Sequence, residues 1–217
     1  MASLNLSQYL SQYKDNLSYQ SMLLGGACAV VSLLLIAANE TTLPLIEEHL
    51  INDKLMMLEQ VLPASEYDND PLSTAQALES QIVYDAEILS ASMADELQAN
   101  AIQLTLPGWG GPLQMIMAVD TQGVVKGVRV ISHKETPGLA DKIEREKSDW
   151  ITSFEGKSLA NTPAKDWAVK KDGGQFDQFT GATITPRAVV KGVYQGLLLH
   201  QAAQSDDSAS TTHSAAN

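Results

Sequence analysis

Asp177–Arg187, with the sequence Asp-Gln-Phe-Thr-Gly-Ala-Thr-Ile-Thr-Pro-Arg, leads from a glycine-containing turn into the start of a helix. Thr185 suits the N-cap and Pro186 the first helical position, where a missing N–H costs nothing. The free N–H groups of a first turn, together with the charge of Arg187, predict an anion site next to Thr183. The helix itself is predicted by apolar residues that recur at helical spacing, namely Val189, Val190, Val193, Leu197 and Leu198.

Asp177–Thr183 fits the pattern Asp-x-x-(Ser/Thr)-Gly-Ala-Thr and resembles the flavinylation motif of the bacterial FMN-binding domain family. In that family a flavin transferase takes FMN from FAD and joins its phosphate to the last threonine of the motif. The resemblance implies one covalent FMN per chain on Thr183, a phosphoester that makes the chain a phosphoprotein in the broad sense. Asp177, Thr180, Gly181 and Ala182 would help to bind the cofactor. Thr183 would be a tether, so no catalytic residue is expected. The alternative is that the motif only shapes a turn before a capped helix.

A second loop, Glu135-Thr136-Pro137-Gly138-Leu139, is similar to a segment that the same family places near the cofactor, Glu-Thr-Pro-Gly-Leu-Gly. Glu135, Thr136, Gly138 and Leu139 are therefore expected to bind FMN, although Ala140 replaces the last glycine. A third loop, between Pro107 and Pro112, carries a tryptophan suited to lie against a flat ring, with ordinary packing as the alternative.

An uncharged apolar run from Met22 to Ala38 predicts a transmembrane helix near the lower limit of length. A cleaved signal peptide, ending near Ala37-Ala38-Asn39, is the alternative, but the preceding segment is long, polar and nearly neutral rather than basic. Lys14 is the only positive residue of that segment, so charge does not determine the orientation.

We expect an α+β protein, with this single N-terminal transmembrane helix followed by a small FMN-binding domain that contains an antiparallel sheet flanked by helices. The expected parts are an N-terminal segment (1–19), the membrane helix (20–39), a helical juxtamembrane region (40–100), the FMN-binding domain (101–203) and a polar, disordered tail (204–217).

Within this plan, Pro63 should end the first helix, and apolar alternation predicts strands over 102–106, 113–119 and 124–131. A helix is expected over 139–154 and a short strand over 167–170.

Composition excludes several classes of function. A net charge of −12 and a pI near 4.6 leave no basic surface for nucleic acid. Cys28 is the only cysteine and lies in the apolar run, so there is no disulfide framework or iron–sulfur ligand set. The four histidines show no ligand spacing, and no metal site is expected. Redox chemistry would have to come from an organic cofactor.

The anchor and the three loops together resemble the G subunit of the Rnf electron transport complex, a cousin of the C subunit of the sodium-translocating NADH:quinone reductase. The resemblance implies a single-pass protein of the bacterial inner (cell) membrane, with residues 1–19 cytoplasmic and the flavin domain periplasmic. It implies an electron carrier in an ion-translocating oxidoreductase, without turnover of its own. Its partners would be the other Rnf-type subunits and a flavin transferase for maturation.

Three alternatives remain open from the sequence. These alternatives are a C-type subunit of the quinone reductase, a flavin-free membrane-anchored assembly module, and a periplasmic flavin enzyme. For the last of these no acid or base is identified in the sequence.

Overall fold

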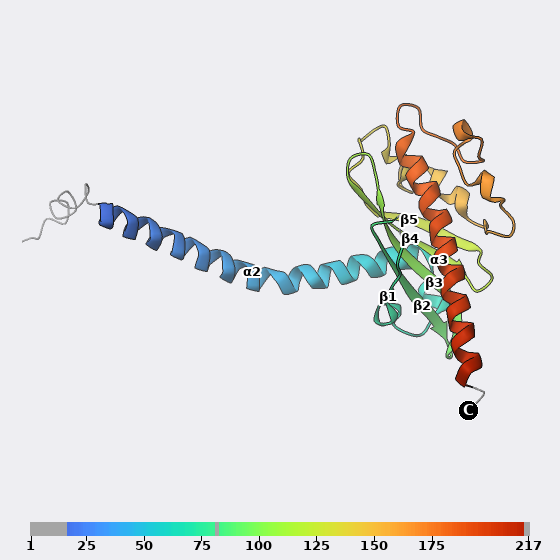
Figure 1. Ribbon diagram of the computed structural model, residues 1–217, viewed down its shortest axis with the longest axis horizontal. Coiled ribbons are helices and arrows are strands. Elements are labelled where there is room, and N and C mark those ends of the chain that lie inside the picture. The colour runs from blue at the N-terminus through green and yellow to red at the C-terminus, as the bar shows by residue number, and fades with distance from the viewer. Residues whose placement is uncertain (1–16, 81–82, 215–217) are drawn as a thin grey trace, which may run out of the picture. The chain divides into compact units, whose positions relative to one another are not determined.

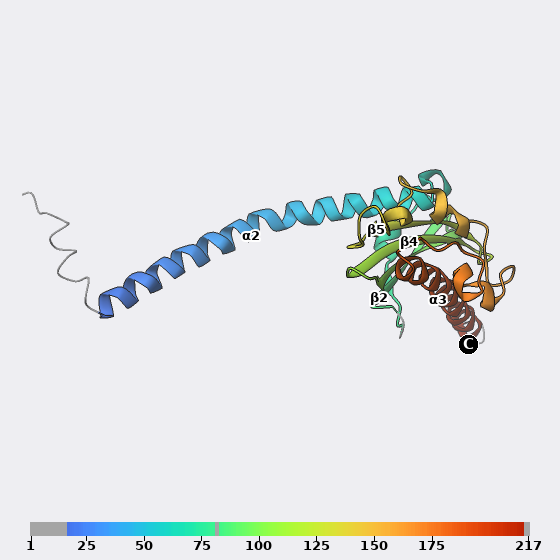
Figure 2. The same ribbon diagram turned by 90° about the horizontal axis from the view of Figure 1, so that it is seen from above.

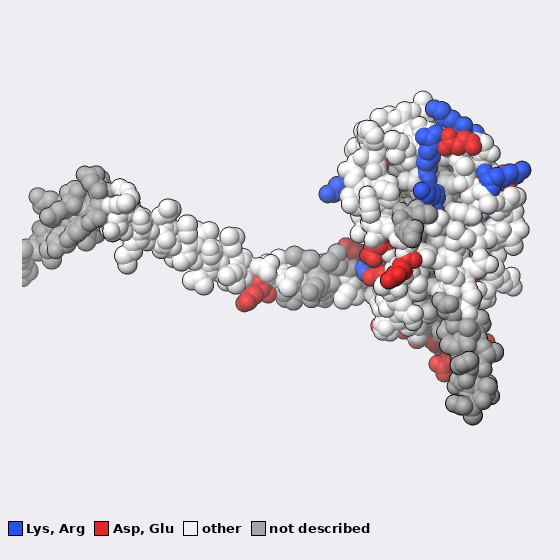
Figure 3. All heavy atoms as spheres, in the orientation of Figure 1, with Lys and Arg blue, Asp and Glu red and all other residues white. Residues whose placement is uncertain are grey.

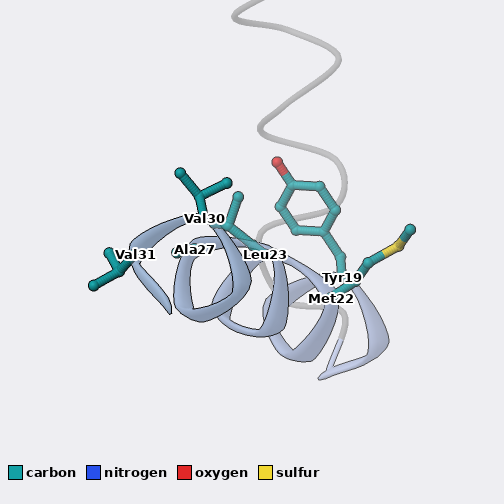
Figure 4. A pocket seen from close by; sticks show the side chains of 7 residues that line it. Tyr19, Met22, Leu23, Ala27, Val30 and Val31 are labelled. Carbon is teal, nitrogen blue, oxygen red and sulfur yellow. The ribbon is translucent and has the colours of Figure 1, made fainter. Parts of the chain in front are cut away.

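The computed structural model describes residues 17–80 and 83–214, and it divides into one unit that ends at Asp53 and another that begins at Lys54. The first unit consists of the N-terminal part of helix α2 (Leu17–Val61). Leu17–Leu43 of this helix is long and apolar enough to cross a membrane and includes the expected span 20–39. Figure 4 shows Met22, Leu23, Val30 and Val31 projecting from it.

Large apolar side chains cover this span and are not packed against any other described residues, from Met22, which is 81% exposed, to Ile36, which is 57% exposed. Exposure of so long an apolar surface to water is unfavourable, whereas contact of the same side chains with lipid is favourable. A helix also suits lipid because its backbone groups form hydrogen bonds with one another. Residues 1–16, which belong to the expected cytoplasmic segment, lie outside the described residues.

The second unit is built on a five-stranded antiparallel sheet in which each strand pairs with the next along the chain (Figure 1). The strands are β1 (Gln76–Ala77), β2 (Asp85–Met93), β3 (Glu96–Pro107), β4 (Pro112–Asp120) and β5 (Val125–Ser132). The three predicted strands are thus confirmed as parts of β3, β4 and β5. Ala94 and Asp95 join β2 to β3 with φ of 51° and 63°, the two positive values of a tight hairpin turn.

The prediction of a helical region over 40–100 was wrong beyond Val61. Helix α2 does end at Val61, before Pro63, but β1, β2 and the first residues of β3 follow it, after the short 3-10 helices η1 (Ala64–Glu66) and η2 (Pro71–Thr74). The Ala/Glu/Leu composition of β2 favours a helix locally, yet nine paired positions with β3 override that preference.

Each face of the sheet is covered by one helix. Helix α3 (Ile184–Ser214) crosses one face, where Val189, Val193 and Leu197 join the main core with Leu104 and Met117 (Figures 1 and 2). On the other face the last turn of α2 packs against alternate residues of β2, β3 and β4, with a second core of Leu58, Val61, Leu62, Leu89, Ala91, Ala99, Ala101, Ile116 and Ala118. Because both faces are buried, β3 and β4 are apolar on both sides.

The segment between β5 and α3 differs from its prediction. In place of a helix over 139–154 there are two short 3-10 helices, η3 (Asp141–Ile143) and η4 (Asp149–Phe154). In place of a strand over 167–170 there is a single bridge from Val169 to Phe176, flanked by η5 (Ala164–Asp166) and η6 (Lys170–Asp172). Buried residues such as Ile143, Ile151 and Phe154 anchor this irregular segment to the core, so tertiary packing rather than local hydrogen bonding fixes it.

In the segment expected to be disordered, 204–217, the structure continues α3 as far as Ser214. A helix that is already nucleated and packed extends at little cost per residue. Residues 215–217 lie outside the described part.

Candidate functional site

A cavity of about 310 Å³ lies where the β3–β4 loop, the loop after β5 and the start of α3 meet. It is lined by Trp109, Glu135, Thr136, Leu139, Ala140, Gly181, Ala182, Thr183, Ile184 and Thr185. The structure therefore brings together the three loops that the sequence singled out separately. The volume is at the lower end of the range that small-molecule sites occupy.

The motif threonine is presented by a tight turn. The N–H of Ala182 donates to the carbonyl of Phe179 at 3.2 Å, and Gly181 adopts φ of 84°. A positive φ at the third position is what a type II turn requires, and glycine supplies it without strain. Phe179 is 6% exposed, and its ring meets that of Trp150 edge to face with 5.1 Å between the ring centroids. This packing holds the turn against the core, while Thr183 lines the cavity.

Helix α3 starts two residues earlier than predicted. The N–H of Arg187 donates to the carbonyl of Thr183 at 3.4 Å, which gives Thr183 the N-cap position. Thr185 is not the N-cap, because it lies inside the first turn, only 1% exposed. Pro186 still fits, since no N–H of the first turn has a partner within the helix. The positive end of the helix dipole therefore lies at Thr183, where a phosphate ester would be stabilised.

Positive charges lie near the helix start but not at the cavity. In the view of Figure 3, Lys and Arg side chains gather on the part of the domain where α3 begins, and acidic side chains of the same unit lie mostly below it. Lys170 is paired with Asp177, and no Lys or Arg is among the described residues that line the cavity. The helix start is therefore the feature that favours a phosphate here.

Arg187, which was expected to add its charge at the phosphate, pairs with a carboxylate in the structure. Its guanidinium binds both carboxylate oxygens of Asp172, at 2.5 and 2.6 Å, and it does not line the cavity. This pairing lowers the pKa of Asp172 and raises the pKa of Arg187. The guanidinium is thus already occupied by a bidentate partner.

Three large apolar side chains remain exposed at the cavity, which is unusual for residues of their size. Trp109 is 69% exposed, Leu139 46% and Ile184 45%. Together they form an apolar rim, defined here as Trp109, Leu139 and Ile184. A flat aromatic ring is the kind of ligand that such a rim would cover, with the polar first turn left for a phosphate.

Among the described residues that line the cavity, Glu135 is the one with an ionisable side chain, and it is 4% exposed. Its Oε1 accepts the Gly110 N–H at 3.1 Å, and its Oε2 accepts the hydroxyl of Thr185. Both oxygens of this carboxyl group are therefore engaged by the protein, one from the β3–β4 loop and one from the first turn of α3.

The remaining predicted residues lie at different depths. Gly138, with φ of 76°, bends the loop after β5 without lining the cavity, and Thr180 is exposed in the turn. Asp177 also lies outside the cavity, where it pairs with Lys170 at 2.6 Å. Within the described residues, no group of three His, Cys, Asp or Glu side chains is arranged to hold a metal ion.

Sequence reasoning did not assign three of the lining residues to the site, namely Ala140, Ile184 and Thr185. Ile184 forms part of the apolar rim, and the available signal in the sequence was an apolar residue directly after the acceptor threonine. The bond of Thr185 to Glu135 had no signal in the sequence, since the two residues are fifty positions apart.

Known proteins resemble this chain over most of its length. The model of the FMN-binding domain family matches residues 108–198, which include all three loops. Among curated proteins, the G subunit of the ion-translocating oxidoreductase complex of Stutzerimonas stutzeri is 51% identical over 85% of this chain and 81% of its own. The corresponding protein of Cereibacter sphaeroides strain ATCC 17029 is 42% identical over 86% and 85%, and that of Escherichia coli K12 is 42% identical over 76% and 82%.

Proposed function

The chain belongs to the family of G subunits of ion-translocating oxidoreductase complexes and contains an FMN-binding domain, and from this premise we propose that it relays electrons through FMN joined by a phosphoester to Thr183. The observation that carries the proposal is the position of Thr183. Its side chain lines the cavity at the N-cap of α3, beside the apolar rim. Few hydroxyl groups combine a helix dipole for a phosphate with an apolar surface for a ring.

Attachment would be a group transfer from FAD. The Thr183 oxygen forms a bond to the FMN phosphorus, the bond from that phosphorus to the AMP half of FAD breaks, and the hydroxyl proton leaves with AMP. We assign this step to a flavin transferase, because no side chain of this cavity is suited to act as its base. Gly181 leaves the approach open, since a Cβ there would meet only Leu139, at 3.7 Å.

When bound, FMN supplies the electron-accepting ring, and the protein supplies position and environment. The first turn of α3 would hold the phosphate through its free N–H groups. The apolar rim would orient the ring and exclude water from one of its sides. The absence of an acid–base pair in the cavity supports a carrier without turnover of its own, which depends on other subunits of the complex for electrons.

We further propose a single-pass topology in the bacterial inner membrane, with residues 1–19 in the cytoplasm and the flavin domain in the periplasm. A covalent tether suits this location, because a dissociable cofactor would be lost into a large compartment between transfers. Alkaline phosphatase fused to the C-terminus is active only outside the cytoplasm, so an inactive fusion would contradict this orientation.

The decisive experiment is Thr183→Ala, expressed together with a flavin transferase. We expect the wild type to fluoresce on a denaturing gel and to gain the mass of one FMN less one water. Thr183→Ala should lose both signals while its unfolding transition is retained, because the hydroxyl is the attachment point and does not belong to the core.

Thr152→Ala is the matched control, since it removes another helix-associated hydroxyl, one that bonds to Asp149 and does not line the cavity. It should keep the full signal. Covalent flavin retained by Thr183→Ala would refute the assignment, and a wild-type chain with Thr183 unmodified in native membranes would leave only an anchored, flavin-free module.

A further inference from the structure

We propose that Glu135 is a positioning residue of the FMN site, which fastens the β3–β4 loop to the first turn of α3 and so holds Trp109 and Thr183 at one cavity. The inference rests on the proposed function for the identity of the ligand. The family resemblance suggested that Glu135 contacts the cofactor, whereas here Glu135 holds other residues of the site in place. Each of the two oxygens of its carboxyl group holds one of these parts.

The first oxygen holds the β3–β4 loop. Oε1 accepts the Gly110 N–H at 3.1 Å, and a Cβ on Gly108 would lie only 2.4 Å from the same oxygen. A Cβ on Gly110 would lie 1.7 Å from the carbonyl oxygen of Lys134. The loop therefore lies directly on residues 134 and 135, and only glycine fits at both contacts. Trp109 stands between these glycines, so the contacts fix its backbone.

The second oxygen holds the helix. Oε2 accepts the hydroxyl of Thr185, which is 1% exposed and two residues from Thr183. Pro186 follows, also buried, and its fixed φ stiffens the first turn. Because the backbone between positions 183 and 186 is helical or N-cap in geometry, the location of Thr185 determines that of Thr183.

Glu135 is itself held in place. Its N–H donates to Nδ1 of His133 at 3.1 Å, and Nε2 of His133 lies 2.9 Å from a carboxylate oxygen of Glu144. Lys147 binds the same carboxylate at 2.7 Å, and these contacts lower the pKa of Glu144. The carboxyl group is thus built into a chain of fixed contacts that leads to the surface.

Direct contact with the FMN phosphate does not fit this arrangement. Each oxygen already accepts a hydrogen bond from the protein, and a carboxylate repels the negatively charged phosphodiester. Glu135 therefore acts through Gly110 and Thr185, which makes it a positioning residue and not a catalytic one.

The test uses the full-length protein first without and then with a flavin transferase. In the flavin-free protein, hydrogen exchange of the peptide that contains Gly110 should become about tenfold faster in Glu135→Ala, since the hydrogen bond from Gly110 to a buried charged group is lost. Thr185→Val keeps that bond but releases the other oxygen of Glu135 from the helix, so exchange should rise there by a smaller factor. Glu135→Gln should stay near the wild type. Its amide keeps one oxygen for Gly110 and offers an N–H to the hydroxyl of Thr185.

The same variants are then flavinylated. Glu135→Ala and Thr185→Val should carry a more mobile flavin, with lower fluorescence anisotropy, and the double variant should be no worse than Glu135→Ala alone, because both changes break one link. Thr162→Val is the matched control. It removes another buried threonine hydroxyl, 3% exposed and bonded to Asn161, away from the cavity.

The outcomes separate the two proposals. If the wild type carries flavin and Thr185→Val matches it in exchange and in anisotropy, the positioning role is overturned and the function stands. If Thr162→Val has the same effect as Thr185→Val, or if Glu135→Gln behaves like Glu135→Ala, the two-bond link is overturned. A wild type without flavin overturns the function, while exchange in the flavin-free protein still decides the link.

Discussion

Gly110 is the position at which a single methyl group should do most damage to the cavity. A Cβ there would lie 1.7 Å from the carbonyl oxygen of Lys134, and both atoms belong to or adjoin the backbone, so no side-chain rotation relieves the clash. The loop must move by more than about 1 Å to reach van der Waals contact. That shift breaks the 3.1 Å hydrogen bond from Gly110 to Glu135.

The cost of Gly110→Ala follows from these two effects. Overpacking against rigid neighbours costs about 1–3 kcal/mol, and leaving a buried donor or acceptor without its partner costs about 1–3 kcal/mol. We expect the free energy of unfolding to fall by about 2–6 kcal/mol, measured by urea denaturation of the full-length chain in detergent. The fraction of chains that carry covalent flavin should fall as well, because Trp109 is displaced from the cavity.

Gly123→Ala is the control for the loss of a glycine. Gly123 lies in the β4–β5 turn with φ of 79°, and no atom stands within 4 Å of its would-be Cβ. The substitution should cost only the left-handed strain of about 1 kcal/mol, with flavin content unchanged. The nine residues of β4 separate this turn from the Gly110 loop by about 30 Å. If Gly110→Ala is no more destabilising than Gly123→Ala, the argument from close backbone approach is refuted.

Two further predictions concern charge. His200 is 2% exposed, and burial lowers its pKa below the ordinary value of 6.5, against the opposing attraction of Asp120. The unfolded chain therefore binds the proton more tightly, so the free energy of unfolding should be level above pH 6.5 and fall as the pH drops below it. In urea titrations between about pH 7 and 5.5, His200→Gln should remove this slope. Asp177 is exposed and paired with Lys170, so Asp177→Asn should lower the free energy of unfolding by less than about 1 kcal/mol. If the carboxylate is recognised during flavin attachment, flavin content should fall in Asp177→Asn and stay full in Lys170→Gln. Equal flavin content in the two variants would contradict that role.

The parts of the fold that the sequence predicted are those with strong local patterns. The apolar run gives the first helix, the spacing of valines and leucines gives α3, and alternation gives β3, β4 and β5. The resemblance to the Rnf family was confirmed by relatives that cover most of the chain. Covalent attachment at Thr183 and contact of the other motif residues with FMN stay predictions.

The errors have physical causes. Strand β2 was missed because Ala, Glu, Leu and Met favour a helix locally, whereas its pairing with β3 and β1 is a tertiary effect. The start of α3 was misplaced because proline fits any position of a first turn, where no N–H has an intrahelical partner, and so does not fix which residue is the N-cap. The partner of Arg187 depends on where η6 lies, and a charge near a helix start does not reveal which opposite charge folds against it.

The position of Thr183 also depends on two glycines far along α3. A Cβ on Gly192 would lie 2.4 Å from a methyl carbon of Leu106, and one on Gly196 would lie 2.4 Å from the sulfur of Met117, so α3 packs unusually close to β3 and β4. Leu106 is the next-to-last residue of β3, directly before the loop that carries Trp109. Eight residues of helix, about 12 Å, separate Gly192 from the first turn.

The close contact at Leu106 therefore fixes the helix against the end of the strand from which the loop departs, and the bond from Thr185 to Glu135 fixes it a second time. Two attachments on one rigid helix determine both where the helix starts and how it is rotated, whereas a single contact would leave the rotation free. The acceptor hydroxyl and the tryptophan therefore share one cavity although they are remote in sequence.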